Sequence, residues 1–235
     1  MLSKNRNNQS GFTIIELMIA TTIFSFILLI ATAGIIRIGQ LYYKGVTESK
    51  VQNNVRSVSD DISRSIQFAK GTKYDGPLNT LPTNTNPVAN FCLGDYRYTG
   101  YIDKPFKLQP SNNTPTGNQT GLWAEKLVSG SACGCPAGTC VTQTEQLLGV
   151  NTRLLYLYVE NLGAGIEKGW HVNVRLAYGD NDLLTHYNDL GNLDTSGTPE
   201  ERVNRRDKAT CRAGTSGGSF CATAQLDTVV KKRLN

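Results

Sequence analysis

The chain has 235 residues and a formal charge of +5, from 24 Lys plus Arg against 19 Asp plus Glu. Because charged residues are only 18% of the chain and hydrophobic residues 39%, the composition excludes both a highly charged unfolded chain and a membrane protein with many spans. At about 150 residues per domain, the length allows one large domain or two small ones. The six cysteines are too few for a disulfide-built miniprotein, and their even number favours an oxidising compartment.

The first apolar segment is long enough to cross a membrane. Residues 17–36 contain no charge, and at about 1.5 Å per helical residue they extend roughly 30 Å, the thickness of a bilayer core. The polar segment before it, residues 1–11, carries Lys4 and Arg6 and no acid. The positive-inside bias therefore places the N-terminus in the cytoplasm and the chain after about residue 40 outside, in agreement with the cysteines.

Glu16 is the unusual residue of this segment. Inserting a carboxylate into a bilayer costs about 2.5 to 3.5 kcal/mol near the centre and less toward the edge. An acid within the apolar run 12–36 therefore indicates a functional role. An ordinary secretory signal, with an apolar stretch of about 7 to 15 residues and a small-residue cleavage site, does not fit. The alternative is a signal anchor that tethers an unrelated domain, with Gly11 and Glu16 present by chance.

The run from Ser10 to Ala20, S-G-F-T-I-I-E-L-M-I-A, resembles the class III signal of type IV prepilins. Leaders of that family are short and basic, end in glycine before phenylalanine, and precede an apolar helix with a glutamate five residues into the mature chain. The resemblance implies that prepilin peptidase cuts after Gly11 on the cytoplasmic side and methylates the new amine of Phe12. It also implies that the Glu16 carboxylate neutralises the N-terminal amine of a neighbouring subunit. The mature chain would keep 235 − 11 = 224 residues and a side-chain charge of +3.

A helical pattern continues beyond the membrane segment. Apolar residues step by three and four along residues 51–69 with charges on the other faces, which predicts an amphipathic helix whose single stripe needs a sheet to cover it. We therefore expect one helix from Phe12 to about Lys70, in which three glycines leave room for bending. The stripe consists of Val51, Val55, Val58, Ile62, Ile66 and Ala69, and the glycines are Gly34, Gly39 and Gly45.

Residues 71–121 hold six of the eight prolines among Asn, Thr and Gly, which excludes long regular elements. We expect an ordered loop region with room for a short strand, because aromatic residues occur within it and Cys92 can fasten it. The alternative is a disordered linker. The aromatic residues are Phe91, Tyr96, Tyr98 and Tyr101.

Strand patterns follow. Residues 153–160 are apolar on both faces, which suits a central strand, and residues 170–178 alternate, which predicts a strand with one wet face. Residues 161–169 would join the two as a hairpin. A closing strand is expected from Phe220 to Thr228, before Val229, Val230 and a basic tail.

These elements and the resemblance predict an α+β, pilin-like fold, in which a long N-terminal helix packs on an antiparallel sheet with a long loop-rich insertion. The insertion and the C-terminal residues resemble those of larger minor subunits, the W-type minor pilins and the J-type pseudopilins of type II secretion. The expected parts are a cleaved leader 1–11, a transmembrane and assembly helix 12–36, its amphipathic continuation 37–70, and an extracytoplasmic head 71–235, which divides into the insertion 71–150 and the main sheet 151–235.

Three short patterns raise the question of catalysis, and none has the context it needs. Residues 214–218, G-T-S-G-G, fit the nucleophile pattern G-x-S-x-G, but the catalytic His should follow Ser216, whereas His171 and His186 both precede it. Residues 163–165, G-A-G, lack the third glycine of a dinucleotide fingerprint. The histidines show no H-E-x-x-H spacing for zinc. We therefore predict neither an enzyme nor a cofactor.

Two clusters offer metal ligands, and a structural role is favoured for each. The thiols of Cys133, Cys135 and Cys140 are spaced closely enough to bind a metal, but an oxidising compartment favours disulfides. The acids at Asp180 and Asp182 offer oxygen ligands to calcium, but their spacing does not match an EF-hand, which favours an ordinary acidic turn.

The densest basic run raises the question of DNA, which some pilus systems take up. Three acids, Glu200, Glu201 and Asp207, dilute its charge, so a solvated loop is favoured over a DNA-binding surface. The run consists of Arg202, Arg205, Arg206, Lys208 and Arg212.

Six cysteines permit 15 pairings. We expect three disulfides, of which Cys211 to Cys221 closes a compact loop near the final strand. Cys92 should pair with one of the three cysteines at 133, 135 and 140. The remaining two would bridge locally, and a bridge between 135 and 140 is easier than one between 133 and 135, whose single-residue spacing is strained.

We expect an assembly protein: a minor pilin-like subunit that inserts in the inner membrane and is then extracted into a pilus or a periplasmic pseudopilus. Its expected partners are prepilin peptidase, other pilin or pseudopilin subunits and the inner-membrane assembly platform. The alternative is a membrane-tethered extracytoplasmic binding module, for DNA or a surface ligand, that does not polymerise. Processing at Gly11 discriminates between the two.

Overall fold

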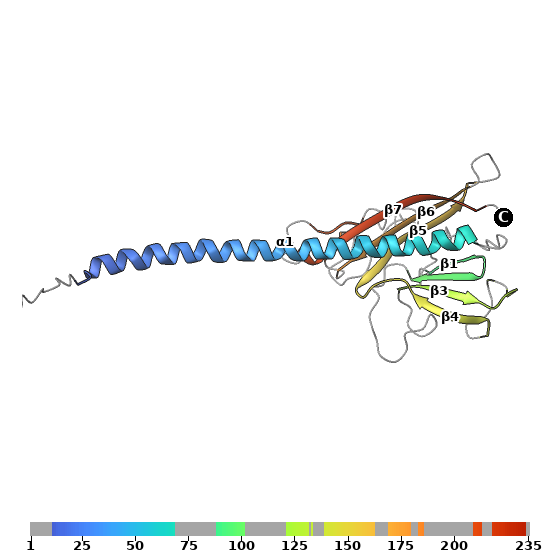
Figure 1. Cartoon of the computed structure of the whole chain (residues 1–235), viewed down its shortest axis with the longest axis horizontal. Helices are drawn as coiled ribbons and strands as arrows, with labels where there is room; N and C mark the ends of the chain where they lie inside the picture. The colour runs from blue at the N-terminus through green and yellow to red at the C-terminus, as the bar shows by residue number, and fades with distance from the viewer. Residues whose placement is uncertain are drawn as a thin grey trace, which may run out of the picture. The chain divides into compact units, whose positions relative to one another are not determined.

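The computed structural model describes residues 11–68, 88–101, 121–131, 133, 139–162, 169–179, 183–185, 209–212 and 218–233. Its internal contacts divide the chain into two units, residues 1–42 and residues 43–235. Helix α1 (Ile14–Phe68) contributes to both (Figure 1).

Helix α1 is continuous over 55 residues and begins directly after Thr13. It stays helical at Gly34, Gly39 and Gly45, so none of these glycines interrupts it. In the first unit its apolar side chains are exposed, and by length and composition the helix can cross a membrane. The predicted helix from residue 12 to about residue 70 agrees with this element.

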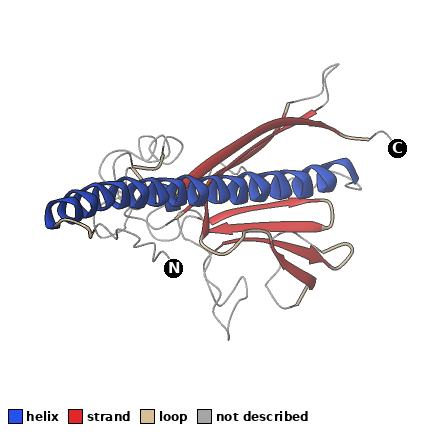
Figure 2. Cartoon of the chain, turned by 60° about the vertical axis from the view of Figure 1, so that its left-hand side comes forward, coloured by secondary structure: helices blue, strands red, loops and turns tan. Residues whose placement is uncertain are grey.

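In the second unit, α1 presents one apolar stripe to a core that two sheets share (Figure 2). Five of the six residues predicted for the stripe are buried, and the sixth, Ala69, lies outside the described residues. The two sheets therefore bury the apolar stripe, as its helical periodicity predicted. The sheet residues of this core include Phe91, Leu122, Trp123, Leu154, Val172 and Val174.

The first sheet is an antiparallel meander in the order β1-β2-β3-β4. Its strands are β1 (Val88–Leu93), β2 (Tyr96–Tyr101), β3 (Gly121–Leu127) and β4 (Val141–Gln146). A two-residue turn joins β1 to β2, where Gly94 has a φ of 61°, a conformation that glycine adopts without strain. The predicted loop-rich insertion 71–150 thus contains a whole sheet, where the sequence suggested a short strand.

The inner strands β2 and β3 of this sheet were hard to predict because both of their faces are buried, whereas β4 is largely exposed. Tyr98 on β2 contacts α1, so its neighbour Arg97 points to the opposite face. There Arg97 Nε donates to Glu125 Oε2 at 2.8 Å, and the two side chains are only 9% and 3% exposed. Thr99 Oγ1 donates to the same oxygen at 3.2 Å. A buried polar row removes the alternation by which strands are recognised in a sequence.

The second sheet has three antiparallel strands in the order β5-β6-β7: β5 (Thr152–Asn161), β6 (Gly169–Tyr178) and β7 (Ala222–Lys231). The β5–β6 hairpin and the alternating burial of β6 are as predicted. The strand at 153–160, whose two apolar faces suit a central position, instead lies at the edge of the described sheet, and β6 is central.

A bulge explains why β5 is apolar on both faces. The register shifts between Leu154 and Tyr156, and the two leucines at this point enter different clusters. Leu154 joins the main core, whereas Leu155 packs in a smaller cluster with Ala177, Leu184, Ala209 and Cys221. The second apolar face therefore meets a local cluster and not a further strand.

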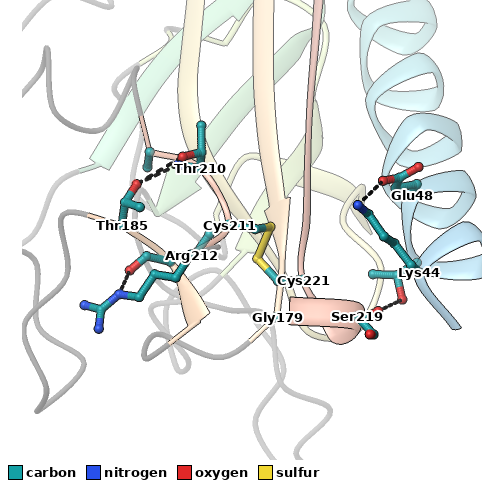
Figure 3. Close-up of a disulfide and its surroundings, with 12 residues drawn as sticks. Lys44, Glu48, Gly179, Thr185, Thr210, Cys211, Arg212, Ser219 and Cys221 are labelled. Atoms are coloured by element: carbon teal, nitrogen blue, oxygen red, sulfur yellow. Dashed lines mark hydrogen bonds and ion pairs between the residues drawn. A yellow bond between two sulfur atoms is a disulfide. The ribbon is translucent and has the colours of Figure 1, made fainter. Parts of the chain in front are cut away.

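The closing strand begins later than predicted. Phe220 belongs to the short 3-10 helix η2 (Gly218–Phe220), and β7 starts at Ala222. Cys221, between the two elements, forms a disulfide with Cys211 (Figure 3). The chain therefore turns at a covalent anchor before it enters the sheet.

Polar contacts join α1 to each sheet. The Tyr98 hydroxyl lies 2.6 Å from Ser65 Oγ and donates to Asp61 Oδ2 at 2.8 Å. Burial raises the pKa of Tyr98 well above its usual range, and the nearby Asp61 carboxylate raises it further. Asn54 Nδ2 donates to Thr152 Oγ1 at 3.0 Å, which connects α1 to β5. The hydroxyl of Tyr98 thus remains a neutral hydrogen-bonding group at this helix–sheet contact.

We expect Ile62→Ala to lower the free energy of unfolding by about 2 to 5 kcal/mol, because it leaves a cavity in the core that α1 shares with both sheets. Arg56→Ala, on the exposed side of the same helix, should change it by no more than about 0.5 kcal/mol. Urea unfolding of the full chain in detergent, followed by the fluorescence of the buried Trp123 and Trp170, measures both. Equal losses in the two variants would contradict the assignment of this face to the core.

Candidate processing and assembly site

Glu16 lies in the first turn of α1, where Thr13 caps the helix. The Thr13 carbonyl accepts the first helical hydrogen bond, from Leu17 N at 3.2 Å, and Thr13 Oγ1 donates to Glu16 Oε2 at 3.3 Å. An acid in this turn is also favoured by the helix dipole. Thr13 is a functional residue that was not predicted, although the spacing T-x-x-E before an apolar run is the signature of a capping box.

The other polar side chains of the apolar segment are satisfied within the helix. Hydroxyl groups donate to carbonyl oxygens three or four residues earlier, at 2.7 to 3.1 Å, as a helix surrounded by lipid requires. The donors are Thr21, Thr22, Ser25 and Thr32. Their side chains therefore need no partner outside the helix.

The Glu16 carboxylate differs from these hydroxyls because one hydrogen bond from a hydroxyl group cannot replace the water that would surround a carboxylate. It is the single charged side chain between Gly11 and Arg37 in the sequence. The ion pairs formed within the described ranges, such as Lys44–Glu48 and Arg97–Glu125, do not include it. In an apolar medium a charged carboxylate is costly unless a cation pairs with it.

Gly11 and Phe12 precede the helix. The Phe12 side chain is 75% exposed, and no atom lies within 4 Å of the position that a Cβ on Gly11 would take. The folded chain therefore sets no steric demand for glycine at position 11. A demand for glycine there would have to come from a molecule that binds this segment.

The cysteines form structural bridges. Cys92 pairs with Cys133, with Cα atoms 5.9 Å apart, and Cys211 pairs with Cys221 at 5.7 Å, both within the expected pairings. Cys140 is disulfide-bonded as well, and its expected partner Cys135 lies outside the described residues. No described cysteine is free, so the described cysteines offer no thiolate to a metal.

The residues considered for catalysis and metal binding are not brought together by the described part of the chain. His171 Nε2 lies 2.6 Å from Asp227 Oδ1 on partly exposed strands, and Asn173 donates to the same carboxylate at 3.1 Å. Within the described ranges, no group of three or more His, Cys, Asp and Glu side chains is placed to hold a metal ion. His186, Ser216, Asp180, Asp182 and residues 163–165 lie outside the described residues.

The basic run is described only at its end. Arg212 Nε donates to the Leu184 carbonyl at 2.9 Å, which ties this side chain to the protein surface. Arg202, Arg205, Arg206 and Lys208 lie outside the described residues. The described part of the run thus shows one guanidinium engaged with the backbone.

A comparison with protein families matches residues 6–32 to the prokaryotic N-terminal methylation motif. No curated protein and no solved structure matches the chain. The matched segment contains Gly11, Phe12 and Glu16, and it includes the exposed apolar start of α1. With this motif, a single long N-terminal helix and two antiparallel sheets, the chain fits a type IV pilin-like protein.

Proposed function

We propose that the chain is a minor subunit of a type IV pilus or of a type II secretion-like filament. In this proposal prepilin peptidase cleaves after Gly11 in the cytoplasm, and the amine of Phe12 is methylated. Before assembly the subunit spans the inner membrane once, with its head on the extracytoplasmic side. The assembly platform then moves it into the filament. The observation that carries the proposal is the methylation motif, which includes the apolar start of α1 and one carboxylate, and within the described ranges no ion pair includes that carboxylate.

Cleavage after Gly11 would supply the missing cation. The new α-amine of Phe12 is positive, and it lies next to the helix N-terminus, where the dipole disfavours a cation. The Glu16 carboxylate of a neighbouring subunit can offset both the positive charge of the amine and its unfavourable position at the helix N-terminus. In an apolar filament core, attraction between the two charges is stronger than in water, and leaving either charge alone is costly. The two charges thus favour lateral contact between helices of different subunits.

The size of the head supports a minor subunit, located at the tip or in an initiating complex, over a repeating subunit of the shaft. A repeating subunit must present compact surfaces to every neighbour, whereas a subunit at a tip faces solvent on one side and tolerates additional structure. Here a four-stranded sheet precedes the three-stranded sheet that closes the core. This additional four-stranded sheet supports a position at the tip, or in a small initiating complex, over a position in the shaft. The nearest functional analogues would be the W-type minor pilins and the J-type pseudopilins.

Expression beside a prepilin peptidase should remove residues 1–11 and leave a methylated Phe12 at the N-terminus. Intact-mass and N-terminal peptide mass spectrometry measure both changes. Gly11→Val should block cleavage without changing the fold, because the structure leaves open space at this position. A chain that keeps its leader beside an active peptidase would support the membrane-tethered binding module instead.

We expect Glu16→Ala to insert in the membrane normally and to be nearly absent from sheared filaments, because the neighbouring amine loses its counter-charge. Thr13→Val is the matched control: it removes the hydroxyl that donates to Glu16 but keeps the charge. It should cost the helix no more than about 1 kcal/mol and leave incorporation close to normal. Immunoblots of membrane and filament fractions compare the variants. If both variants were lost from filaments to the same extent, helix capping would explain the role of Glu16.

Quantitative proteomics of purified filaments tests the minor rank. We expect a copy number far below that of the most abundant pilin, because a tip or initiating subunit occurs once or a few times per filament. Deletion of the subunit should nevertheless reduce filament number if it acts in initiation. A copy number comparable to that of the major pilin would contradict the minor rank.

A further inference from the structure

Two aromatic side chains lie together at the start of the second unit. The ring centroids of Tyr43 on α1 and Phe220 in η2 are 5.5 Å apart, with the rings tilted by 43°. The two side chains are nevertheless 53% and 49% exposed. They form a small aromatic pair at the surface, contributed by segments 177 residues apart in sequence (220 − 43).

The turn that carries Phe220 is fixed from three sides. Thr47 Oγ1 donates to the Ser219 carbonyl at 3.5 Å, and Cys221 is bonded to Cys211. Gly179, at a φ of 121°, packs so closely that a Cβ there would lie 3.0 Å from the Phe220 carbonyl oxygen. Figure 3 shows the disulfide with Gly179 beside it and Ser219 facing α1 near Lys44 and Glu48. These contacts therefore hold Phe220 at the surface.

The position of the pair along the chain indicates what covers it. Tyr43 follows the uncharged segment 17–36 by seven residues, which at 1.5 Å per helical residue is about 10 Å. The headgroup layer on each side of a bilayer is roughly 5 to 8 Å thick. Because helical side chains tilt toward the N-terminus, the Tyr43 ring lies closer to the membrane than its backbone does. The ring therefore falls within the headgroup layer, where tyrosine is enriched in membrane proteins.

We propose that Tyr43 and Phe220 form an interfacial contact with the headgroup layer of the phospholipid bilayer while the subunit is in the membrane. The contact is continuous with the membrane-spanning part of α1, and it rests on the proposed membrane anchoring. Lys44 and Glu48, an exposed pair 3.9 Å apart, lie next along the helix and suit the wet outer part of the layer.

Quenching by brominated lipids tests the contact. The full chain carrying Phe220→Trp is reconstituted in phosphatidylcholine and phosphatidylglycerol vesicles, with bromine near the headgroup or deep in the acyl chain. Val229→Trp is the matched control, because Val229 is 56% exposed and lies nine residues further along the chain, on β7, about 30 Å away in an extended strand. The signal of each variant is compared with that of the unchanged chain, which has the same two buried tryptophans.

We expect shallow bromine to remove about half of the emission that Phe220→Trp adds, since interfacial rings lie at headgroup level, and deep bromine to remove less. The emission of Val229→Trp should not change. Equal quenching of the two variants, or none, overturns the interfacial contact even if the chain floats with the vesicles. A chain that does not float with vesicles contradicts the membrane anchoring itself, and the inference with it.

Discussion

The apolar stripe of α1 between Val51 and Ile66 is the constraint on which the head depends. It belongs to the same helix as the exposed apolar segment, so the two halves of α1 need different surroundings. The first half is apolar on all sides, which suits lipid or a bundle of like helices. The second half is covered on one side only, and both sheets supply that cover. The Tyr98–Asp61 and Asn54–Thr152 hydrogen bonds then define how the helix lies against each sheet.

The sequence predicts those elements whose surroundings follow a single period. The stripe of α1 and the alternation of β6 have one buried side, so their patterns are directly legible. The first sheet was not predicted, because the buried Arg97–Glu125 pair makes its second face polar and enclosed at once. The sequence suggested a central position for β5, which lies at the edge, because two adjacent leucines at a bulge resemble the pattern of a central strand. Such cases depend on tertiary contacts, which a single sequence does not display.

The candidate site shows the same division between local and external causes. Local chemistry explains part of Glu16, since an acid at the third helical position, with threonine before the helix, stabilises the first turn. A local account does not explain why an acid stands in an apolar segment, and it leaves Gly11 without a steric reason. The matched methylation motif covers both residues. Residues that a fold does not itself require are good candidates for recognition by another molecule.

The continuity of α1 has a mechanical consequence. No loop residues separate the exposed apolar half of α1 from the half that joins the core, since α1 is unbroken from Ile14 to Phe68. Any pull applied to its N-terminal half would reach the head as shear along the stripe. Sliding the stripe past the sheets would require many side-chain contacts to break together. Under the proposed function, a chain built in this way would be drawn out of the membrane by its N-terminal helix without losing the packing of its sheets.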